Sequence, residues 1–374
     1  MIANKILQWQ RLIITITTCI VFSVPAFAQK GWTPLFNGKD LTGWDTWLRP
    51  PDMVGYVDSS SSEPIGLNKD PLHIFTINNG ILRITGEVWG AITSKKSYNN
   101  YHLRFETKWG ELKYYPKDTA LRDAGLLFHC TGPLDFAFKA WMRSAEFQIE
   151  ESNIGDYYDV SGGKPEIPVS EGRSPLNEKV EQYDALAPLK REKLWRVHRS
   201  GNFESPHGEW TRSELVARHA DAVFIVNGFV VNRLYNIFRE DIKRQSTGGK
   251  LQFQSEGAEH FFRRIDIRPL KFASNTPLLA SNDSIFTVSS TPQNIIITNT
   301  GDPVEIIAVE LLGKNTDNFM VRLPEFPMTL KKNKQLILPV TLKPNHTVQQ
   351  DVFLRLETVS GPVENFQVRL RPAP

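Results

Sequence analysis

The sequence predicts an all-β protein, because alternating strand patterns recur along its 374 residues and helical patterns are nearly absent. Tyr101–Trp109 is the clearest strand, since Tyr, Leu, Phe, Thr and Trp alternate there with His, Arg, Glu and Lys. Asn227-Gly228 lies between two apolar runs and is a strong hairpin signal. Many long alternating strands predict a two-sheet antiparallel sandwich, whose curved face can hold an extended ligand.

The N-terminus predicts a secretory signal peptide over residues 1–28. Lys5 and Arg11 precede the apolar run Leu12–Val24, which closes on Ala26–Ala28. The apolar run is about 13 residues long and a membrane span needs about 20, so a retained anchor is the weaker alternative. We expect cleavage after Ala28, no membrane span in the mature chain, and export to the periplasm, the cell surface or the extracellular space.

Charge content argues against nucleic-acid binding, and cysteine content argues against an internal disulfide in the mature chain. Lys and Arg total 44 and Asp and Glu total 41; loss of Lys5 and Arg11 with the signal leaves 42 against 41. A nearly neutral chain without a basic run has no electrostatic footprint for nucleic acid. Cys19 lies in the signal, so Cys130 has no partner for an internal disulfide. Its alternation beside Phe128 predicts a buried thiol on an apolar strand face.

Mature length and a change of composition predict two domains. Gln29–Leu270 is rich in strand and turn patterns, and Lys271–Asp283 is a polar connector that contains proline. Ser284–Pro374 has a pattern of short strands. A weak helical pattern covers Asn177–Leu189. The strands expected in the first domain are Ile81–Thr85, Tyr101–Trp109, Ala124–Cys130, Ala145–Glu150, Val223–Val226, Phe229–Val231, Leu251–Gln254 and Phe262–Ile267.

Seven short strands in the second domain predict an immunoglobulin-like β-sandwich. The turn Asn299–Asp302 and the letters ITNTGDPVEI resemble bacterial Ig-like modules of the Hydin type. Because this domain has no Cys and no polar cluster, we expect a spacer or a docking module for a surface or a protein partner. Its expected strands are Ile285–Val288, Ile295–Thr298, Val304–Leu311, Phe319–Leu323, Leu336–Leu342, Val352–Glu357 and Phe366–Leu370.

The candidate site is centred on the strand Ala145–Glu150. Its side chains alternate, so Glu146, Gln148 and Glu150 form a polar row on one face. In the strand Ala124–Cys130, the same alternation turns Gly125, Leu127 and His129 away from the apolar face. If the two strands share a sheet, His129 can lie near the row.

A solvated strand face is the simpler interpretation of such a row. The surroundings favour a site, because Trp141, Met142 and Arg143 precede the strand and the loop Asn153–Tyr158 follows it. Sugar-binding sites combine aromatic faces, on which rings stack, with fixed hydrogen-bonding groups for the hydroxyls. The pattern therefore indicates a carbohydrate site.

Six ordered segments resemble the 3-keto-disaccharide hydrolase family and cover essentially the whole first domain. They read LFNGKDLTGW, WGAITSKKSYNNYHLRFETKWG, RDAGLLFHCTGP, SAEFQIEESNIGDYY, GEWTRSELVARHADAVFIVNGFVVN and LQFQSEGAEHFFRRIDIRPL. The resemblance implies a concanavalin-like jelly-roll sandwich, export, and action on glycosides, some of them oxidised at C3. The chain departs from the family at Phe262-Arg263-Arg264, where the family usually has Phe-Arg-Asn.

A ketone at C3 acidifies the C2 proton, so one base can remove it and the enediolate can expel the C1 substituent before water adds. This chemistry needs a base, a donor to the C3 oxygen and an acid for the leaving group. We expect His129 as the base, with Glu150 as the alternative, and Glu146 as the acid. The expected substrate-binding residues are Trp89, Arg143, Gln148, Asp156, Gln254, Glu256 and Arg263, and His260 is a weaker candidate.

Two other functions remain open at this point. An ordinary endo-glycosidase of the laminarinase type fits Glu-x-Gln-x-Glu less well, because its middle acid is missing and positions 146 and 150 lie about 13 Å apart along a strand. The other function is a non-catalytic carbohydrate-binding protein. No metal-ligand spacing and no cofactor motif occurs, although a structural calcium ion is compatible with a sandwich of this kind.

Overall fold

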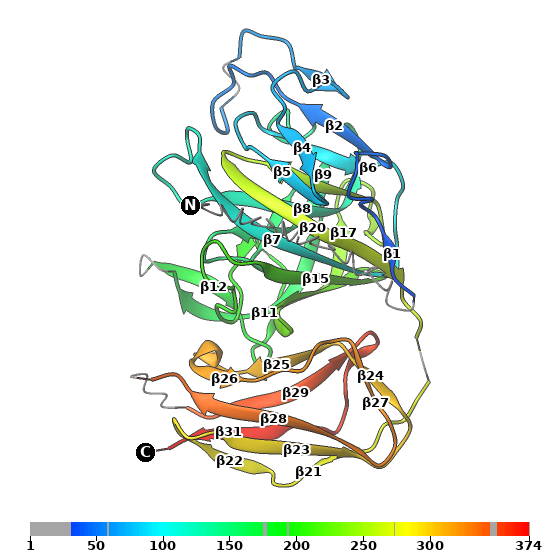
Figure 1. Ribbon diagram of the computed structural model, residues 1–374, viewed down its shortest axis with the longest axis vertical. Coiled ribbons are helices and arrows are strands. Elements are labelled where there is room, and N and C mark those ends of the chain that lie inside the picture. Colours follow the sequence, from blue (N-terminus) through cyan, green and yellow to red (C-terminus); the bar gives the residue numbers. More distant parts are fainter. Residues whose placement is uncertain are drawn as a thin grey trace, which may run out of the picture.

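The computed structural model describes residues 31–57, 60–174, 178–192, 194–272, 274–344 and 350–373 (Figure 1). In this part of the chain the regular elements are β-strands and one short 3-10 helix, which confirms the all-β prediction. The expected signal peptide lies outside the described residues. None of the helices in the described ranges is long and apolar enough to cross a membrane.

The first domain consists of two facing antiparallel sheets. We call one of them the site sheet; its eight strands, in spatial order, are β14 (Arg196–Val197), β10 (Tyr157–Val160), β9 (Arg143–Glu150), β8 (Asp123–Thr131), β19 (Lys250–Ser255), β6 (Gly90–Ser94), β2 (Trp44–Leu48) and β3 (Gly66–Leu67). The opposing sheet is formed by β17 (Phe229–Arg239), β16 (Asp221–Val226), β15 (Thr211–Arg218), β7 (Tyr101–Lys113), β20 (Ala258–Pro269), β5 (Ile81–Ile84) and β4 (Phe75–Asn78).

Short strands extend the opposing sheet at its margins. They are β1 (Thr33–Pro34) on β20, β11 (Lys164–Arg173) and β18 (Arg244–Gln245) on β17, and β12 (Lys179–Tyr183) and β13 (Leu189–Lys190) on β11. The helical pattern expected for Asn177–Leu189 is therefore wrong over the described residues of that range. Hydrogen bonding to β11 makes an extended conformation more favourable there than a weak helix.

The hairpin expected at Asn227-Gly228 is present. Both residues have positive φ, 47° and 84°, as a two-residue turn between twisted strands requires, and Val226 pairs with Phe229 across it. Asn tolerates this conformation and Gly adopts it without a steric cost. The turn thereby sets the register of β16 and β17.

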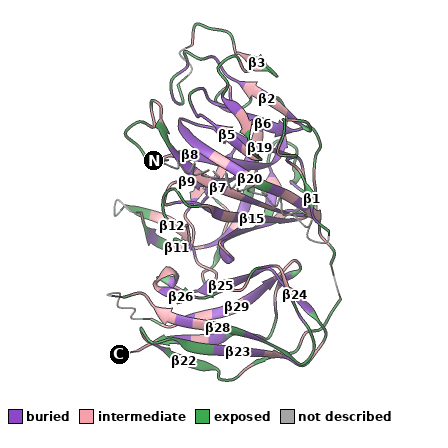
Figure 2. Ribbon diagram, viewed as in Figure 1, coloured by how far each residue is buried: buried purple, intermediate pink, exposed green. Residues whose placement is uncertain are grey.

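The core of the first domain lies between its two sheets. Phe147 of the site sheet packs on Phe105 and Phe224 of the opposing sheet, with ring centroids 6.0 and 4.6 Å apart, and Phe253 packs on Phe262 at 4.8 Å. Long stretches of these strands are buried, whereas the loops are mostly intermediate or exposed (Figure 2). Because successive side chains alternate, filling this core turns Glu146 and Gln148 onto the other face of β9.

The second domain has its own core and contains six of the seven expected strands. The expected strand Val304–Leu311 is wrong as a single element, because the chain breaks at Ile307 and the two halves pair with different strands. One sheet is formed by β21 (Leu279–Ser281), β23 (Gln293–Asn299), β28 (Lys334–Leu342) and β26 (Phe319–Val321). The other strands are β22 (Ile285–Val288), β31 (Val368–Pro372), β29 (Val352–Thr358), β25 (Ala308–Leu312), β30 (Gly361–Pro362), β24 (Val304–Ile306) and β27 (Met328–Leu330), and the 3-10 helix η1 spans Thr316–Asn318. An Ig-like assignment stays a prediction.

The two domains share a tightly packed interface. β17 and β25 pair in parallel through Phe229↔Val309, and Phe229 packs into the second domain's core. Beside this pair, the guanidinium of Arg233 contacts Glu310 at 3.1 Å and Glu357 at 2.8 Å, and all three side chains are at most 2% exposed. Burial of charges is tolerated only when they are paired in this way.

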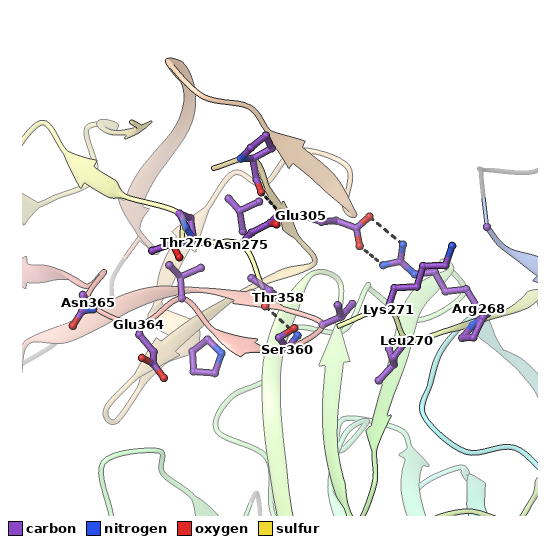
Figure 3. Close-up of a pocket in the computed structure, with 18 of the residues that line it drawn as sticks. Arg268, Leu270, Lys271, Asn275, Thr276, Glu305, Thr358, Ser360, Glu364 and Asn365 are labelled. Carbon is purple, nitrogen blue, oxygen red and sulfur yellow. Dashed lines mark hydrogen bonds and ion pairs between the residues drawn. The ribbon is translucent and has the colours of Figure 1, made fainter. Parts of the chain in front are cut away.

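A cavity of about 990 Å³ opens at one margin of the interface, next to the connector between the domains (Figure 3). Arg268 from β20 reaches across it and binds Glu305 of the second domain through both guanidinium nitrogens, at 2.6 and 3.1 Å. None of the residues that line this cavity belongs to the polar row on β9.

We predict that Glu310→Ala destabilises the full-length protein by about 3 kcal/mol, because it removes one of two carboxylates from a buried guanidinium. Tyr183 and Arg355 also lose a partner, since both contact Glu310. Urea denaturation measures the change. The control is Glu171→Ala, in an exposed pair with Lys179, which should leave the midpoint nearly unchanged. Equal midpoints for the two variants would contradict the account of the interface.

Candidate active site

The polar row occupies the middle of the site sheet, on the face opposite the core. Across β8 and β9, Glu146 pairs with Leu127, Gln148 with Gly125, and Glu150 with Asp123. Paired residues of neighbouring strands point to the same face, so Asp123 joins the row. The row thus contains three carboxyl groups on two adjacent strands.

Gly125 makes the close approach of these groups geometrically feasible. A Cβ atom at this position would lie 2.0 Å from Glu146 Oε1 and 2.2 Å from Gln254 Oε1. Both oxygens therefore lie over the bare backbone of β8, within a space that any other residue would fill. The structure thus places Gln254, expected only as a substrate-binding residue, beside Glu146.

The row is not a solvated strand face. Asp123, Glu146 and Glu256 are 3%, 5% and 4% exposed, and Gln148 and Gln254 are buried as well. Asp123 Oδ1, Glu146 Oε1 and Gln254 Oε1 are buried without a hydrogen-bond partner. Unpaired buried oxygens are costly in a folded protein, so these atoms are free to bind a ligand.

Burial and nearby charges raise the pKa values of Glu146, Glu256 and Asp123. Burial, followed by the charges of Glu256 and Asp123, raises the pKa of Glu146 well above its usual value. Burial and the charge of Asp123 raise the pKa of Glu256 in the same way. The pKa of Asp123 is raised to about 6, because burial outweighs the charge of Lys117. The site therefore combines three buried acids whose raised pKa values favour their neutral forms more than water would.

Two further polar groups complete the centre of the site. The ammonium group of Lys117 contacts Asp123 Oδ2, and its side chain is 13% exposed. The hydroxyl of Tyr56 donates a 3.0 Å hydrogen bond to Glu256 Oε1. Within the described residues, no group of three or more His, Cys, Asp or Glu side chains is arranged to hold a metal ion.

A second charged network borders the row at β10 and β14. Arg196 Nη2 lies 2.7 Å from both Glu150 Oε2 and Asp156 Oδ2. Asp156 is fully buried and also contacts His198 Nδ1 at 2.8 Å and the backbone amide of Arg199 at 2.9 Å. Burial alone would raise the pKa of Asp156, but the hydrogen bond from His198 and the nearby arginines outweigh it and lower that pKa.

Aromatic rings flank the row on both sides. Trp89 stacks on Trp141 with ring centroids 5.4 Å apart, and Tyr56 packs edge-on against Trp89 at 5.0 Å. At the other side, Tyr158 packs edge-on against Trp195, with ring centroids 5.3 Å apart. Tyr56 is 52% exposed and Trp195 is 68% exposed. Each side thus offers an accessible ring on which a sugar face can stack.

His129 does not lie with the carboxyl groups, so the expectation that it lies near the row is wrong. The chain forms a β-bulge between Phe128 and Thr131, where His129 has a φ of 54°. The bulge reverses the alternation, so Cys130 packs with Leu127 on the site face, and not with Phe128 in the core. Burial lowers the pKa of His129 to about 4, and the hydroxyl of Ser246 lies 3.5 Å from Nδ1.

Both expected arginines also lie elsewhere. Arg263 is on β20 of the opposing sheet, where it pairs with Glu106 and stacks over Trp210 at 4.1 Å. Arg143 is at the start of β9, 3.5 Å from Asp241 and over the ring of Phe136. Neither arginine has a contact with the carboxyl groups of the row. Both act as partners of local carboxylates.

The departure from the family at Arg264 and the weak candidate His260 have structural explanations. Arg264 has a φ of 53° within a bulge of β20 and pairs with Glu106 at 3.0 Å. Asn adopts that conformation more readily than Arg, and the ion pair partly offsets the cost here. His260 is buried in the first domain, with its ring 4.8 Å from that of Phe262.

Sequence reasoning missed Asp123, Lys117, Tyr56, Arg196 and Trp195. For Asp123 the signal was available, since extending the alternation of Gly125 and Leu127 by one step places it in the row. The other four come from loops or a two-residue strand, whose approach to the row depends on tertiary packing. No local pattern in the sequence predicts that approach.

An all-β sandwich that buries carboxyl groups beside aromatic rings on an outer sheet face belongs to the class of carbohydrate-active domains. Residues 31–268 match a family described as 3-keto-alpha-glucoside-1,2-lyase-like domain. The chain belongs to this family, and the resemblance drawn from its six segments is confirmed to that extent. No protein with a curated description matches the chain.

Solved structures with weak similarity include a candidate glycosyl hydrolase from Parabacteroides distasonis, at 18% identity and a TM-score of 0.39, covering 64% of this chain and 94% of that one. A β-glucanase from Bacillus licheniformis is 10% identical with a TM-score of 0.31, over 65% of this chain and 100% of the other. The carbohydrate-binding module CBM66 from Bacillus subtilis is 8% identical with a TM-score of 0.29, over 60% and 95%.

We predict that Glu146→Gln stabilises the protein relative to the wild type by an amount that grows as pH rises above about 4.5. The folded-state pKa of Glu146 is raised above its unfolded value of 4.5. Its contribution is therefore fully present below pH 4.5 and is lost as the pH rises toward the folded-state pKa. Urea denaturation at several pH values measures the difference.

Asp156→Asn is the control of opposite sign, because the pKa of Asp156 is lowered in the folded state. Its contribution is present above pH 3.8 and is lost as the pH falls, so this variant should be less stable than the wild type at neutral pH. A difference between Glu146→Gln and the wild type that shrinks with rising pH would refute a buried, protonated Glu146.

Proposed function

We propose that the protein is a carbohydrate-active enzyme that cleaves 3-keto-glucosides by removing the C2 proton and eliminating the C1 substituent. One observation carries this proposal: the buried carboxyl groups of Asp123 and Glu146 lie on the same sheet face, each with an oxygen that has no protein partner. Burial raises the pKa of both groups, which suits Asp123 to the role of base and Glu146 to the role of acid. Elimination requires one base and one acid at the same time. The family's lyase-like description supports the same chemistry.

Asp123 is the base in this proposal. A pKa of about 6 keeps it largely ionised at neutral pH while leaving it more basic than an ordinary carboxylate. Asp123 Oδ1 takes the C2 proton, and the electron pair of the C2–H bond moves toward the C3 carbonyl oxygen. Lys117, which contacts Asp123 Oδ2, supplies positive charge near the enediolate that forms. Glu150 is the weaker alternative, because Arg196 and Asn153 already engage it.

Glu146 is the acid. As the enediolate collapses, a C1–C2 double bond forms, the C1–O bond breaks, and Glu146 protonates the departing oxygen. A neutral carboxyl group is needed for this step, and the burial of Glu146 among other acids keeps it neutral. Addition of water to the unsaturated sugar would then complete hydrolysis. His129 has no part in this scheme, since its contacts lie elsewhere.

The aromatic rings and the amides orient the substrate. Tyr56 and Trp195 offer exposed ring faces on opposite sides of the row, and Gln148 and Gln254 supply hydrogen-bonding groups between them. An ordinary endo-glycosidase could use the same acid and a carboxylate nucleophile, and a carbohydrate-binding protein would use the rings alone. The fate of the C2 proton separates these three functions.

The decisive experiment follows a 3-keto-glucoside that carries deuterium at C2. We expect the purified enzyme to release the alcohol while the sugar product loses its deuterium to solvent, because Asp123 removes that atom. Mass spectrometry of the products measures the label, and incubation without enzyme controls for spontaneous exchange. Release of the alcohol with the deuterium retained would replace elimination by direct displacement at C1.

Matched variants assign the roles. Asp123→Asn and Glu146→Gln should each lower turnover by about 10²-fold or more. His129→Gln, which changes a buried side chain away from the row, should keep turnover within a few-fold while the protein remains folded. Binding of the keto-glucoside with no release of alcohol by the wild type would instead favour a binding protein.

We further propose that the protein is exported and processed. Lys5, Arg11 and the apolar run that ends at Ala28 support this proposal. Protein isolated from its native host should begin at Gln29. An N-terminus at Met1 would contradict export by this signal.

A further inference from the structure

The segment Arg196–Glu204, here called the bridging segment, runs from the site to the second domain. At its start, Arg196 and His198 bind the buried carboxylate of Asp156, and Arg196 also binds Glu150. Arg199 adds hydrogen bonds from its backbone amide to Asp156 and from Nη1 to Asn153 Oδ1, both 2.9 Å long. The start of the segment is thus part of the wall of the site.

The middle of the bridging segment is held by the second domain. Thr316 Oγ1 donates to the carbonyl of Ser200 at 3.4 Å, and the amide of Asn202 donates to Asp317 Oδ2 at 3.3 Å. Between them, a Cβ at Gly201 would lie 3.0 Å from both Asp317 Cβ and Thr316 Oγ1. Helix η1 therefore packs directly on the backbone of the bridging segment.

Three consecutive residues of β17 connect the same parts from a second direction. The carbonyl of Val231 accepts a 2.9 Å hydrogen bond from the amide of Ser200. The side-chain amide of Asn232 donates to the carbonyls of Gly155 and Val197, each at 3.3 Å. Arg233 then binds the buried carboxylates of the second domain. The end of the segment is also anchored, because Phe203 stacks on Phe229 at 4.3 Å.

We propose that the second domain is a structural component of the active site, in which Thr316 and Asp317 position Arg196 and His198 through the bridging segment. Neither a spacer nor an independent docking module requires contacts with this segment. Glu150 pairs with Asp123 across the strands, and Arg196 neutralises it. The second domain thereby acts on the electrostatic environment of the base without touching substrate.

Loosening of the bridging segment is expected to raise the pKa of Asp123. The negative charge of Glu150 raises the pKa of Asp123, and the positive charge of Arg196 lowers it. If the bridging segment loosens, Arg196 shields Glu150 less, and the base protonates at a higher pH. The acidic limb of the pH–rate profile should therefore move upward.

The test uses the full chain with Thr316→Ala and Asp317→Ala combined, and separately with Gly201→Val, which wedges η1 away from the segment. Hydrogen exchange followed by mass spectrometry should show about threefold faster exchange or more for amides of residues 196–204 in both variants. The acidic limb of turnover of a 3-keto-glucoside should rise by about half a pH unit.

Glu305→Ala is the control, because it breaks the Arg268 contact at the other margin of the same interface. It should leave both the exchange of residues 196–204 and the pH profile unchanged. Unaltered exchange in both test variants, or equal effects of the control, would overturn the inference. The activity readout depends on the proposed function, but the exchange readout does not, so the failure of one can be told from the failure of the other.

Discussion

The absence of a side chain at Gly125 allows the carboxyl group of Glu146 to lie over the middle of the site sheet, where it is removed from water. That burial has two consequences. It raises the pKa of Glu146, and it places Glu146 where the charges of Glu256 and Asp123 raise that pKa further. A set of acids that cannot all ionise divides into a proton donor and a proton acceptor, which is what elimination requires.

The sequence patterns predicted the fold class and the positions of most strands, and they assigned several residues of the candidate site to one strand face. Strand alternation assigns a face to each residue, so the sequence could predict that Glu146, Gln148 and Gln254 belong to the site. His129 was misplaced because a β-bulge inserts one residue, and alternation cannot anticipate such an insertion. Lys117 and Arg196 were missed because they reach the row from elements that only tertiary packing brings near it.

The interface between the domains extends this view of the site. Arg233 is buried between two carboxylates of the second domain, and the preceding residue, Asn232, holds the backbone at Gly155 and at Val197 of β14. The same strand, β17, therefore carries both the residue that pairs with charges at the interface and the residue that holds the backbone beside the site. This connection explains why two domains that each have a core nevertheless pack through buried charges, which two independent modules would have no need to bury.

The most direct test of the account is the protonation state of Glu146 itself. Carbon-13 NMR of the protein labelled at glutamate side-chain carboxyl carbons, with the Glu146 signal assigned by its loss in Glu146→Gln, follows this group through a pH titration. The account predicts that the signal keeps the chemical shift of a protonated carboxyl group at pH 7 and titrates only above it. A signal that titrates near the ordinary value of 4.5 would contradict the account, because Glu146 would then be ionised and unable to protonate a leaving group.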